Sequence, residues 1–199
     1  MPQFGLKGIK AAKYVNTNGV ITYTNATAVG DAMTANLELR YAEGRLFAED
    51  MLAEYMRKAV GGTISLGVKY IKQSAQVLLF GATTKDRSIT YTPAGGQQTT
   101  ATATSIVTGG HDVGQYVGLA FYSPDMVDGV LKFTCVFVKK CLFGPPSMSL
   151  KTQGENITFN TPTTSGEFLA EDGEDKALYE IAVLDDEEAA KAWVQAVLA

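Results

Sequence analysis

Two segments in which apolar and polar residues alternate strictly constrain the fold of this chain more than any other feature. The first runs from Met33 to Tyr41 and alternates Ala35, Leu37, Leu39 and Tyr41 with Thr34, Asn36, Glu38 and Arg40. The second, over 62–71, alternates Ile64, Leu66, Val68 and Tyr70 with Thr63, Ser65, Gly67 and Lys69. A period of two is typical of a β-strand with one face on a core and the other in water. We therefore expect two paired amphipathic strands, with Gly61-Gly62 as the turn that leads into the second.

The segment between these strands, residues 42–60, is the most ambiguous part of the sequence. It carries five large apolar residues among charges of both signs, namely Phe47, Met51, Leu52, Tyr55 and Met56. Their spacing fits one stripe of a helix, and Gly44 and the flanking strands fit a long hairpin equally well. Packing of these side chains on the chain's own core is the simpler interpretation, and a contact with another subunit is the alternative.

The rest of the chain also indicates a mainly β protein. Residues 74–81 are typical of a short helix closed by Gly81. We expect strands at 99–107, 155–161 and 178–184, a hairpin of 115–123 with 130–140 around Asp128-Gly129, turns at Pro93–Gly96 and Gly109-Gly110, and a mobile loop within Lys85–Gln98.

The last residues predict an amphipathic helix over 185–198. Asp185 and Glu188 have the spacing of a capping box, and one apolar stripe is formed by Ala190, Trp193, Val194, Val197 and Leu198. The 199 residues are enough for one sizeable core. The predicted fold is mainly β: a single-domain β-sandwich or open barrel with a flanking α-helix and a C-terminal helix.

Composition excludes several function classes. The formal net charge is −4, and no basic cluster is present of the kind that grips nucleic-acid phosphates. Acidic residues are concentrated near the C-terminus. The segment from Glu167 to Glu188 contains ten acidic residues and one basic residue, Lys176. Cys135 and Cys141 fall in one predicted strand and are expected to be reduced. No run of residues is apolar enough for a signal peptide or a membrane span.

Residues with catalytic or metal-binding chemistry are sparse. His111 is the only histidine and lies in a turn-like Gly-Gly-His-Asp context, which disfavours a catalytic triad and a zinc site. The acidic run 171–175 lacks the spacing of a calcium loop and is interpreted as a solvated turn. None of the paired glycines is followed by the lysine of a phosphate-binding loop. We therefore predict a protein that is not an enzyme and that uses no metal or cofactor.

Several motifs, in this order, resemble one known family. They are AMTANLELRYAEG, VGGTISLGVKY, SAQVLLFG, YVGLAFYSPDMVDGVLKFTCVFVKK, KTQGENITFNTPTTSGEF and EEAAKAWV. Together they cover most of the chain from about residue 30, and their order and spacing resemble the major tail tube proteins of long-tailed bacteriophages, in the branch from phages of Gram-positive hosts. The resemblance is absent from the N-terminus and from Lys85–Thr108.

The resemblance implies a tail-tube fold and a structural role in the virion. Subunits of that family form hexameric rings, which stack into a tube through which DNA leaves the capsid without specific binding. The implied partners are further copies of the chain and other tail proteins, such as the tape measure, tail terminator and distal tail proteins, with no membrane. The implied place of synthesis is the cytoplasm of the bacterial host.

Carried onto this chain, the family pattern assigns roles to particular segments. Residues 42–60 correspond to an arm between rings and 185–198 to the C-terminal helix. Residues 1–30, which lie outside the resemblance, are predicted to be an N-terminal arm of the single domain 1–199. The strand pairs 33–41 with 62–71 and 130–141 with 154–162 are candidates for the inner barrel. Candidates for the channel lining are Asn36, Glu38, Arg40, Thr63, Ser65, Lys69, Lys132, Thr134, Asn156, Thr158 and Asn160. Candidates for contacts between subunits are Phe47, Met51, Leu52, Tyr55 and Met56.

Other interpretations stay open on the sequence alone. The alternative for some of the channel candidates is that they point to the outside of the tube. A capsid decoration or surface-display β-sandwich would be a binding module that forms no tubes. The inner tube of a contractile injection machine has the same fold, and a sandwich hydrolase would need convergent carboxylates in a cleft.

Overall fold

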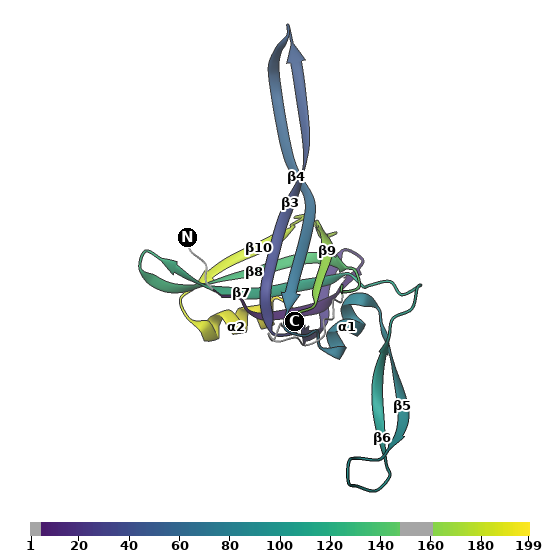
Figure 1. Ribbon diagram of the computed structural model, residues 1–199. Coiled ribbons are helices and arrows are strands. Elements are labelled where there is room, and N and C mark those ends of the chain that lie inside the picture. The colour runs from purple at the N-terminus through teal and green to yellow at the C-terminus, as the bar shows by residue number, and fades with distance from the viewer. Residues whose placement is uncertain (1–4, 148–160) are drawn as a thin grey trace, which may run out of the picture.

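The computed structural model describes residues 5–147 and 161–199 and shows a mainly β protein with two short helices (Figure 1). The strands are β1 (Lys7–Thr17), β2 (Val20–Ala28), β3 (Ala32–Ala48), β4 (Met51–Val68), β5 (Thr83–Tyr91), β6 (Thr99–Val107), β7 (Val117–Val127), β8 (Val130–Phe143), β9 (Thr163–Leu169) and β10 (Tyr179–Leu184). The helices are α1 (Gln73–Phe80) and α2 (Glu187–Ala196). The prediction of a mainly β fold is confirmed.

An eight-stranded antiparallel sheet forms the body, in the order β2-β1-β7-β8-β9-β4-β3, with β10 added beside β8. Strand β8 pairs with three other strands. β7 pairs along one edge of β8, and β10 and β9 pair with different parts of its other edge. β10 pairs with Phe133–Val138 and β9 with Lys140–Phe143. The predicted hairpin around Asp128-Gly129 is confirmed as the β7–β8 turn, where both residues have positive φ.

One side of the sheet encloses the main core. Ile64, Leu66 and Val68 on β4 are buried there, as the alternation predicted, against Leu119 on β7 and Phe168 on β9. Helix α1 adds Ala75, Leu79 and Phe80 to the same core, and Gly81 ends the helix with a left-handed φ of 69°. The predicted short helix and its glycine cap are confirmed.

The opposite side of the sheet carries the C-terminal helix. Successive residues of β7 point to opposite faces, so that Leu119 lies in the main core while Ala120 and Tyr122 contact the α2 cluster. The buried cluster under α2 comprises Ala12, Ala120, Tyr122, Phe133, Cys135, Phe137, Ala190, Val194 and Leu198. The predicted apolar stripe of the helix is confirmed.

The cap of α2 is one residue later than predicted. Asp186 is the N-cap, and its Oδ1 accepts a 2.6 Å hydrogen bond from the Glu188 backbone N–H. Asp185 instead pairs with Lys132 at 2.8 Å between its Oδ1 and Nζ. The capping box of Asp185 with Glu188 is therefore wrong.

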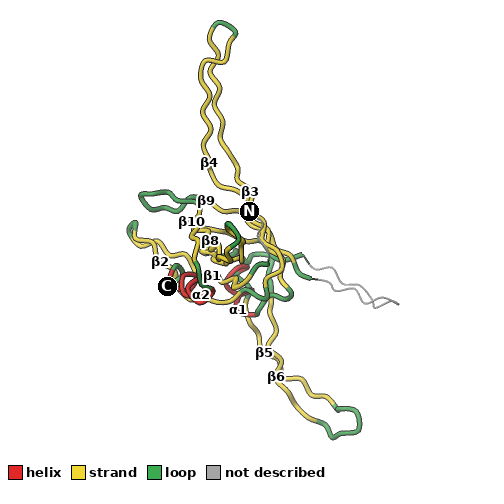
Figure 2. Tube along the Cα trace, turned by 90° about the vertical axis from the view of Figure 1, so that its left-hand side faces the viewer, coloured by secondary structure: helices red, strands yellow, loops and turns green. Residues whose placement is uncertain are grey.

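Two long hairpins leave the body in opposite directions (Figures 1 and 2). One is the outer part of β3–β4, and the other is β5–β6, a separate two-stranded sheet. The predicted mobile loop within Lys85–Gln98 is mostly strand, because Lys85–Tyr91 pairs with Thr99–Ser105 and only the residues between the strands form a loop.

Three further predictions differ from the structure. Residues 1–30 are not an arm in their described part, because β1 lies between β2 and β7 with Ile9, Ala11 and Ala12 buried. Gly61-Gly62 is no turn but lies within β4, next to a register shift opposite Arg40 and Tyr41. Tyr70 follows the end of β4 and is exposed, whereas it was predicted to point inward. The predicted strand 155–161 lies almost wholly outside the described residues.

Candidate assembly surfaces

We call the outer part of the β3–β4 hairpin, residues 41–60, the upper arm (Figure 1). Cross-strand pairs continue from Tyr41 with Ala59 to Ala48 with Met51, so the arm is two strands wide throughout. Glu49 and Asp50 make its tight turn with φ of 51° and 62°. The ambiguity between helix and hairpin over 42–60 is thus resolved as hairpin.

One face of the upper arm carries a ladder of charged and aromatic side chains. Glu43 pairs with Arg45 at 3.6 Å and with Arg57 at 3.3 Å. The guanidinium carbon of Arg57 lies 3.7 Å from the centre of the Tyr41 ring, and that of Arg45 lies 5.7 Å from the Tyr55 ring. The pKa of the Tyr55 hydroxyl is raised, mainly by partial desolvation and to a smaller extent by its hydrogen bond to Glu43. The Glu43–Arg57 pair and the two arginine–tyrosine contacts join β3 to β4 on this face.

Large apolar side chains of the upper arm are exposed. Met51 and Met56 are the most exposed, at 73% and 74%, and the others are Tyr41, Leu46, Phe47, Leu52, Tyr55 and Val60. All five residues proposed for contacts between subunits are in this set. The interpretation that they pack on the chain's own core is wrong, because the arm projects away from it (Figure 2).

A polar face covers the outer side of β3, β4 and β9 in the body. The exposed side chains of Asn36, Glu38, Arg40, Thr63 and Ser65 all lie on it, brought together by the pairing of β3 with β4. The adjacent strand β9 adds Thr163, Ser165 and Glu167, which sequence reasoning missed. The signal was present, since buried Thr164 and Phe168 alternate with these three residues.

Contacts within this polar face involve both signs of charge. Arg40 reaches Glu167 at 3.7 Å across β4, and the Asn36 side-chain amide donates to Glu38 at 3.1 Å. Its two acids and one base leave it close to neutral.

The remaining channel candidates do not join this face. Lys69 follows the end of β4, and Lys132 on β8 is engaged with Asp185. Thr134 is only 7% exposed and donates to Asp125 Oδ2 at 3.4 Å, so its assignment to an open channel surface is wrong in this protomer. Asn156, Thr158 and Asn160 lie outside the described residues.

The β5–β6 hairpin, which we call the lower arm, also has two different faces. Thr84, Asp86, Ser88 and Thr90 share one face with Thr100, Thr102, Thr104 and Ile106. Thr104 Oγ1 donates to Asp86 at 2.7 Å, and the hydroxyls of Thr90 and Thr100 lie 3.3 Å apart. The other face presents Lys85, Arg87, Ile89 and Tyr91 beside small Ala101 and Ala103.

Strand β10 offers a third exposed apolar surface. Its residues Tyr179, Ile181 and Val183 point away from the α2 side, and Ile181 and Val183 are more than half exposed. The strand pairs only with β8 among the described strands, so its outer edge has free backbone groups. Free edges with apolar side chains favour association with another chain.

The acidic run 171–175 forms an exposed turn, as predicted, and one of its carboxylates ties this turn to the sheet. Asp172 accepts hydrogen bonds from Lys140 at 2.8 and 2.7 Å and from the Tyr14 hydroxyl at 3.1 Å. Hydrogen bonding to Lys140 is the main cause that lowers the pKa of Asp172, whereas burial raises that of Tyr14. The contacts fix the chain between β9 and β10 against β1 and β8.

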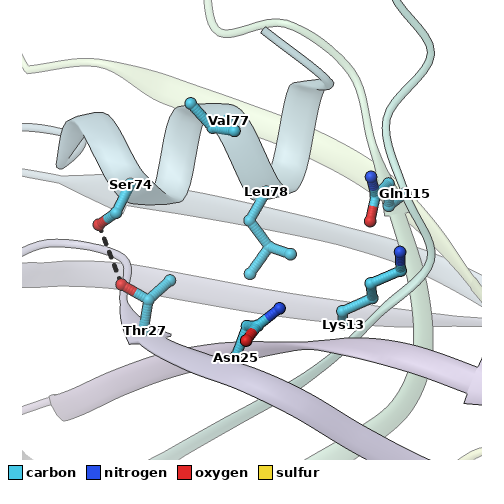
Figure 3. Close-up of a pocket in the computed structure, with 7 residues that line it drawn as sticks. All are labelled: Lys13, Asn25, Thr27, Ser74, Val77, Leu78 and Gln115. Carbon is cyan, nitrogen blue, oxygen red and sulfur yellow. Dashed lines mark hydrogen bonds between the residues drawn. The ribbon is translucent and has the colours of Figure 1, made fainter. Parts of the chain in front are cut away.

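One hollow lies between α1 and the β1–β2 hairpin and measures about 310 Å³ (Figure 3). Its lining holds one titratable side chain, Lys13, with Asn25, Gln115 and the Ser74–Thr27 hydroxyl pair, whose oxygens are 3.0 Å apart.

His111 lies away from this hollow and is exposed in a loop. Within 5–147 and 161–199, no three His, Cys, Asp or Glu side chains are placed to hold a metal ion.

Both cysteines are free and buried, as predicted for reduced thiols. Desolvation raises the pKa of Cys135 to about 11 and that of Cys141 further. No helix in the described part of the chain is long and apolar enough to cross a membrane.

Comparison with known proteins gives no assignment for this chain. No protein-family model matches its sequence, and no curated protein sequence matches it.

Proposed function

We propose that this chain is a structural subunit that polymerises with copies of itself into a tube, and that the tube is the tail tube of a long-tailed bacteriophage. Subunits form hexameric rings, the rings stack, and DNA leaves the capsid through the central channel. The protein acts in the virion tail after synthesis in the host cytoplasm, in contact with other tail proteins. It carries out no chemistry.

The exposed apolar side chains of the upper arm carry this proposal. A two-stranded hairpin is at best marginally stable alone in water, and contiguous exposed apolar surface usually marks an interface. Phe47, Met51 and Met56 stand more than half exposed, and the core of the chain lies at the other end of the hairpin. Aromatic side chains and methionine are enriched in interface cores, so a neighbouring subunit is the natural cover.

The polar face on β3, β4 and β9 suits the inner wall of such a tube. It carries hydroxyl, amide and mixed charged groups and only one base, Arg40, which is paired with Glu167. Many phosphate contacts would hold DNA in place and oppose its passage. A nearly neutral polar wall lets DNA slide. In a closed ring, pairing of free strand edges between subunits would also remove the open edges of β3 and β10.

The proposal is tested by electron microscopy of the concentrated protein, together with its mass in dilute solution. We expect rings or tubes with a central channel at high concentration and a smaller species at low concentration. A stable dimer or trimer without a channel would overturn the proposal and favour a decoration or surface-display module.

A matched variant without the upper arm sharpens this test. Ala42 and Lys58 face each other across the hairpin, so an Asn-Gly turn can replace residues 43–57 without altering the body. We expect this variant to keep the unfolding midpoint of the wild type and to lose only the β-strand signal of the removed residues in circular dichroism, but to form no tubes at concentrations where the wild type does. Tubes of unchanged yield would show that the arm has no part in assembly.

A further inference from the structure

The lower arm is the least explained feature of the molecule. Nine cross-strand pairs join β5 and β6, from Thr83 with Val107 to Tyr91 with Thr99, yet nearly all of the hairpin lies in solvent. Its side-chain hydrogen bond to the rest of the chain runs from Gln73 Nε2 to the Thr104 carbonyl at 3.4 Å. A hairpin of this length with so little support is expected to gain its stability from a partner.

The two arms have opposite directions and similar reach. The upper arm rises from one end of the body and the lower arm descends from the other in both views (Figures 1 and 2). From Tyr41 to Ala48, and from Thr83 to Tyr91, each extends about 25 Å at roughly 3.3 Å per residue. If copies stack along this common direction, the upper arm of one copy and the lower arm of the next enter the same layer.

The two arms carry charges of opposite sign. The upper arm has Glu49, Asp50 and Glu54 near its tip, and the lower arm has Lys85 and Arg87 on one face, in the half of β5 nearer the body. None of these five side chains takes part in an ion pair with another described residue. Such charges are available to another chain.

Apolar groups accompany these charges on both arms. Ile89 and Tyr91 lie on the same face of the lower arm as Lys85 and Arg87, and both are about half exposed. On the upper arm, Phe47 and Met51 flank the acidic turn. An interface with an apolar centre and complementary charges around it fits both surfaces.

We infer that the lower arm is a second assembly arm, whose basic and apolar face binds the acidic tip of the upper arm of another copy of this chain in the adjacent layer. The inference rests on the proposed self-assembly and adds to it a specific contact between layers. The hydroxyl-rich face of the lower arm then stays in solvent, because its Asp86 and threonine groups already satisfy one another.

The test is a charge-reversal exchange. One variant carries Lys85→Glu and Arg87→Glu, a second carries Glu49→Lys and Glu54→Lys, and a third combines all four changes. The readout is the critical concentration for assembly, measured by sedimentation and checked by electron microscopy. Lys176→Glu, on an exposed lysine away from both arms, controls for net charge. Unfolding midpoints confirm that each variant folds, since all of the changed residues are exposed.

We expect each two-residue reversal to raise the critical concentration at least tenfold, and the combined variant to return it to within about threefold of the wild type. The control should leave it within twofold. Two results would overturn the contact between arms and leave the proposed function standing, provided that the wild type forms tubes. One is a critical concentration that does not change in either two-residue variant. The other is an increase in the critical concentration that the combined four-residue variant does not reverse. Absence of any wild-type assembly would instead overturn the proposed function, and this inference with it.

Discussion

The base and the outer part of one hairpin, β3–β4, are both rich in apolar residues and have opposite environments. In the base, Leu37, Leu39, Ile64 and Leu66 are buried or half-buried, and polar residues alternate with them. Beyond Tyr41 the strands continue with Phe47, Leu52 and Met56, which are as apolar but lie more than half exposed. Alternation identifies the strands of the base and their two faces, but whether apolar side chains are covered depends on the elements that lie across from them.

This difference indicates two separate roles for one supersecondary unit. The base contributes to the free energy of folding of the single chain, because its side chains leave water during folding. The arm contributes little until a second chain covers it. Substitutions in the base should therefore change unfolding, and substitutions in the arm should change association.

The largest expected effect is that of Ile64→Ala in the base. Ile64 is fully buried in the main core, and removal of three carbons there should lower the free energy of unfolding by about 2–5 kcal/mol. Chemical denaturation of the dilute protein measures it. Met56→Ala, on the same strand but in the arm, is the control, with an expected change within about 0.5 kcal/mol. Equal losses in both variants would contradict the division of roles.

Substitution of one glycine in the base and one in the upper arm by alanine compares how closely the backbone is packed in the two parts. A Cβ on Gly62 would lie 2.0 Å from the Glu38 carbonyl oxygen and 2.6 Å from the Phe168 ring, whereas one on Gly44 would meet nothing within 4 Å. We expect Gly62→Ala to cost about 1–3 kcal/mol, because strands β3, β4 and β9 must shift. Gly44→Ala should be neutral or stabilising by up to about 0.5 kcal/mol. Thermal unfolding of both variants decides it.

An ion pair in the body should contribute more to the free energy of unfolding than an ion pair in the upper arm. Asp172 is held by Lys140, whose side chain is largely buried, so Asp172→Asn should lower the free energy of unfolding by about 1 kcal/mol at neutral pH. Because the folded pKa of Asp172 is lowered, this contribution is present above the unfolded pKa of about 4 and is lost as the pH falls through the folded value. Denaturation across acidic pH should show the wild type and the variant converge; a difference that persists at the lowest pH would contradict this.

The smallest effect is expected for Glu43→Gln in the upper arm. Glu43 pairs with Arg45 and Arg57 in an exposed ladder, and such pairs contribute about 0–1 kcal/mol. Unfolding should change by less than about 0.5 kcal/mol. The pKa of Tyr55 should fall toward its ordinary value, since Glu43 is one cause of its increase. Absorbance titration with Tyr55→Phe as reference detects the fall, and an unchanged titration would show that the ladder is not formed in solution.

Local patterns in the sequence were sufficient for much of the fold. The β7–β8 hairpin has a turn that favours positive φ at Asp128-Gly129, and the stripe of α2 matches a helical period, so both could be predicted from neighbouring residues. Pairing between strands that are distant in the sequence could not be predicted in this way. Nothing local indicates that β1 lies between β2 and β7, and for this reason residues 1–30 were misread as an arm.

The same limit applies to the candidate surfaces. The polar residues of β3 and β4 were found because the alternation is strict, but Glu167 on β9 was missed because its neighbour is β4, about a hundred residues earlier. Thr134 was misassigned because it is buried in the protomer and donates a hydrogen bond to Asp125 on the neighbouring strand β7. For the upper arm, the helix and the hairpin gave equally good patterns, and only the cross-strand pairs from Tyr41 with Ala59 to Ala48 with Met51 separate them.

Oxidation of Met51 and Met56 tests the central claim most directly. Both are about three-quarters exposed in the single chain, so peroxide should convert them quickly to sulfoxides in dilute solution, as measured by mass spectrometry of the peptides. At concentrations where the protein assembles, the account predicts at least tenfold slower oxidation of both residues. Equal oxidation rates in the dilute and the assembled protein would contradict the claim that a second copy covers the upper arm.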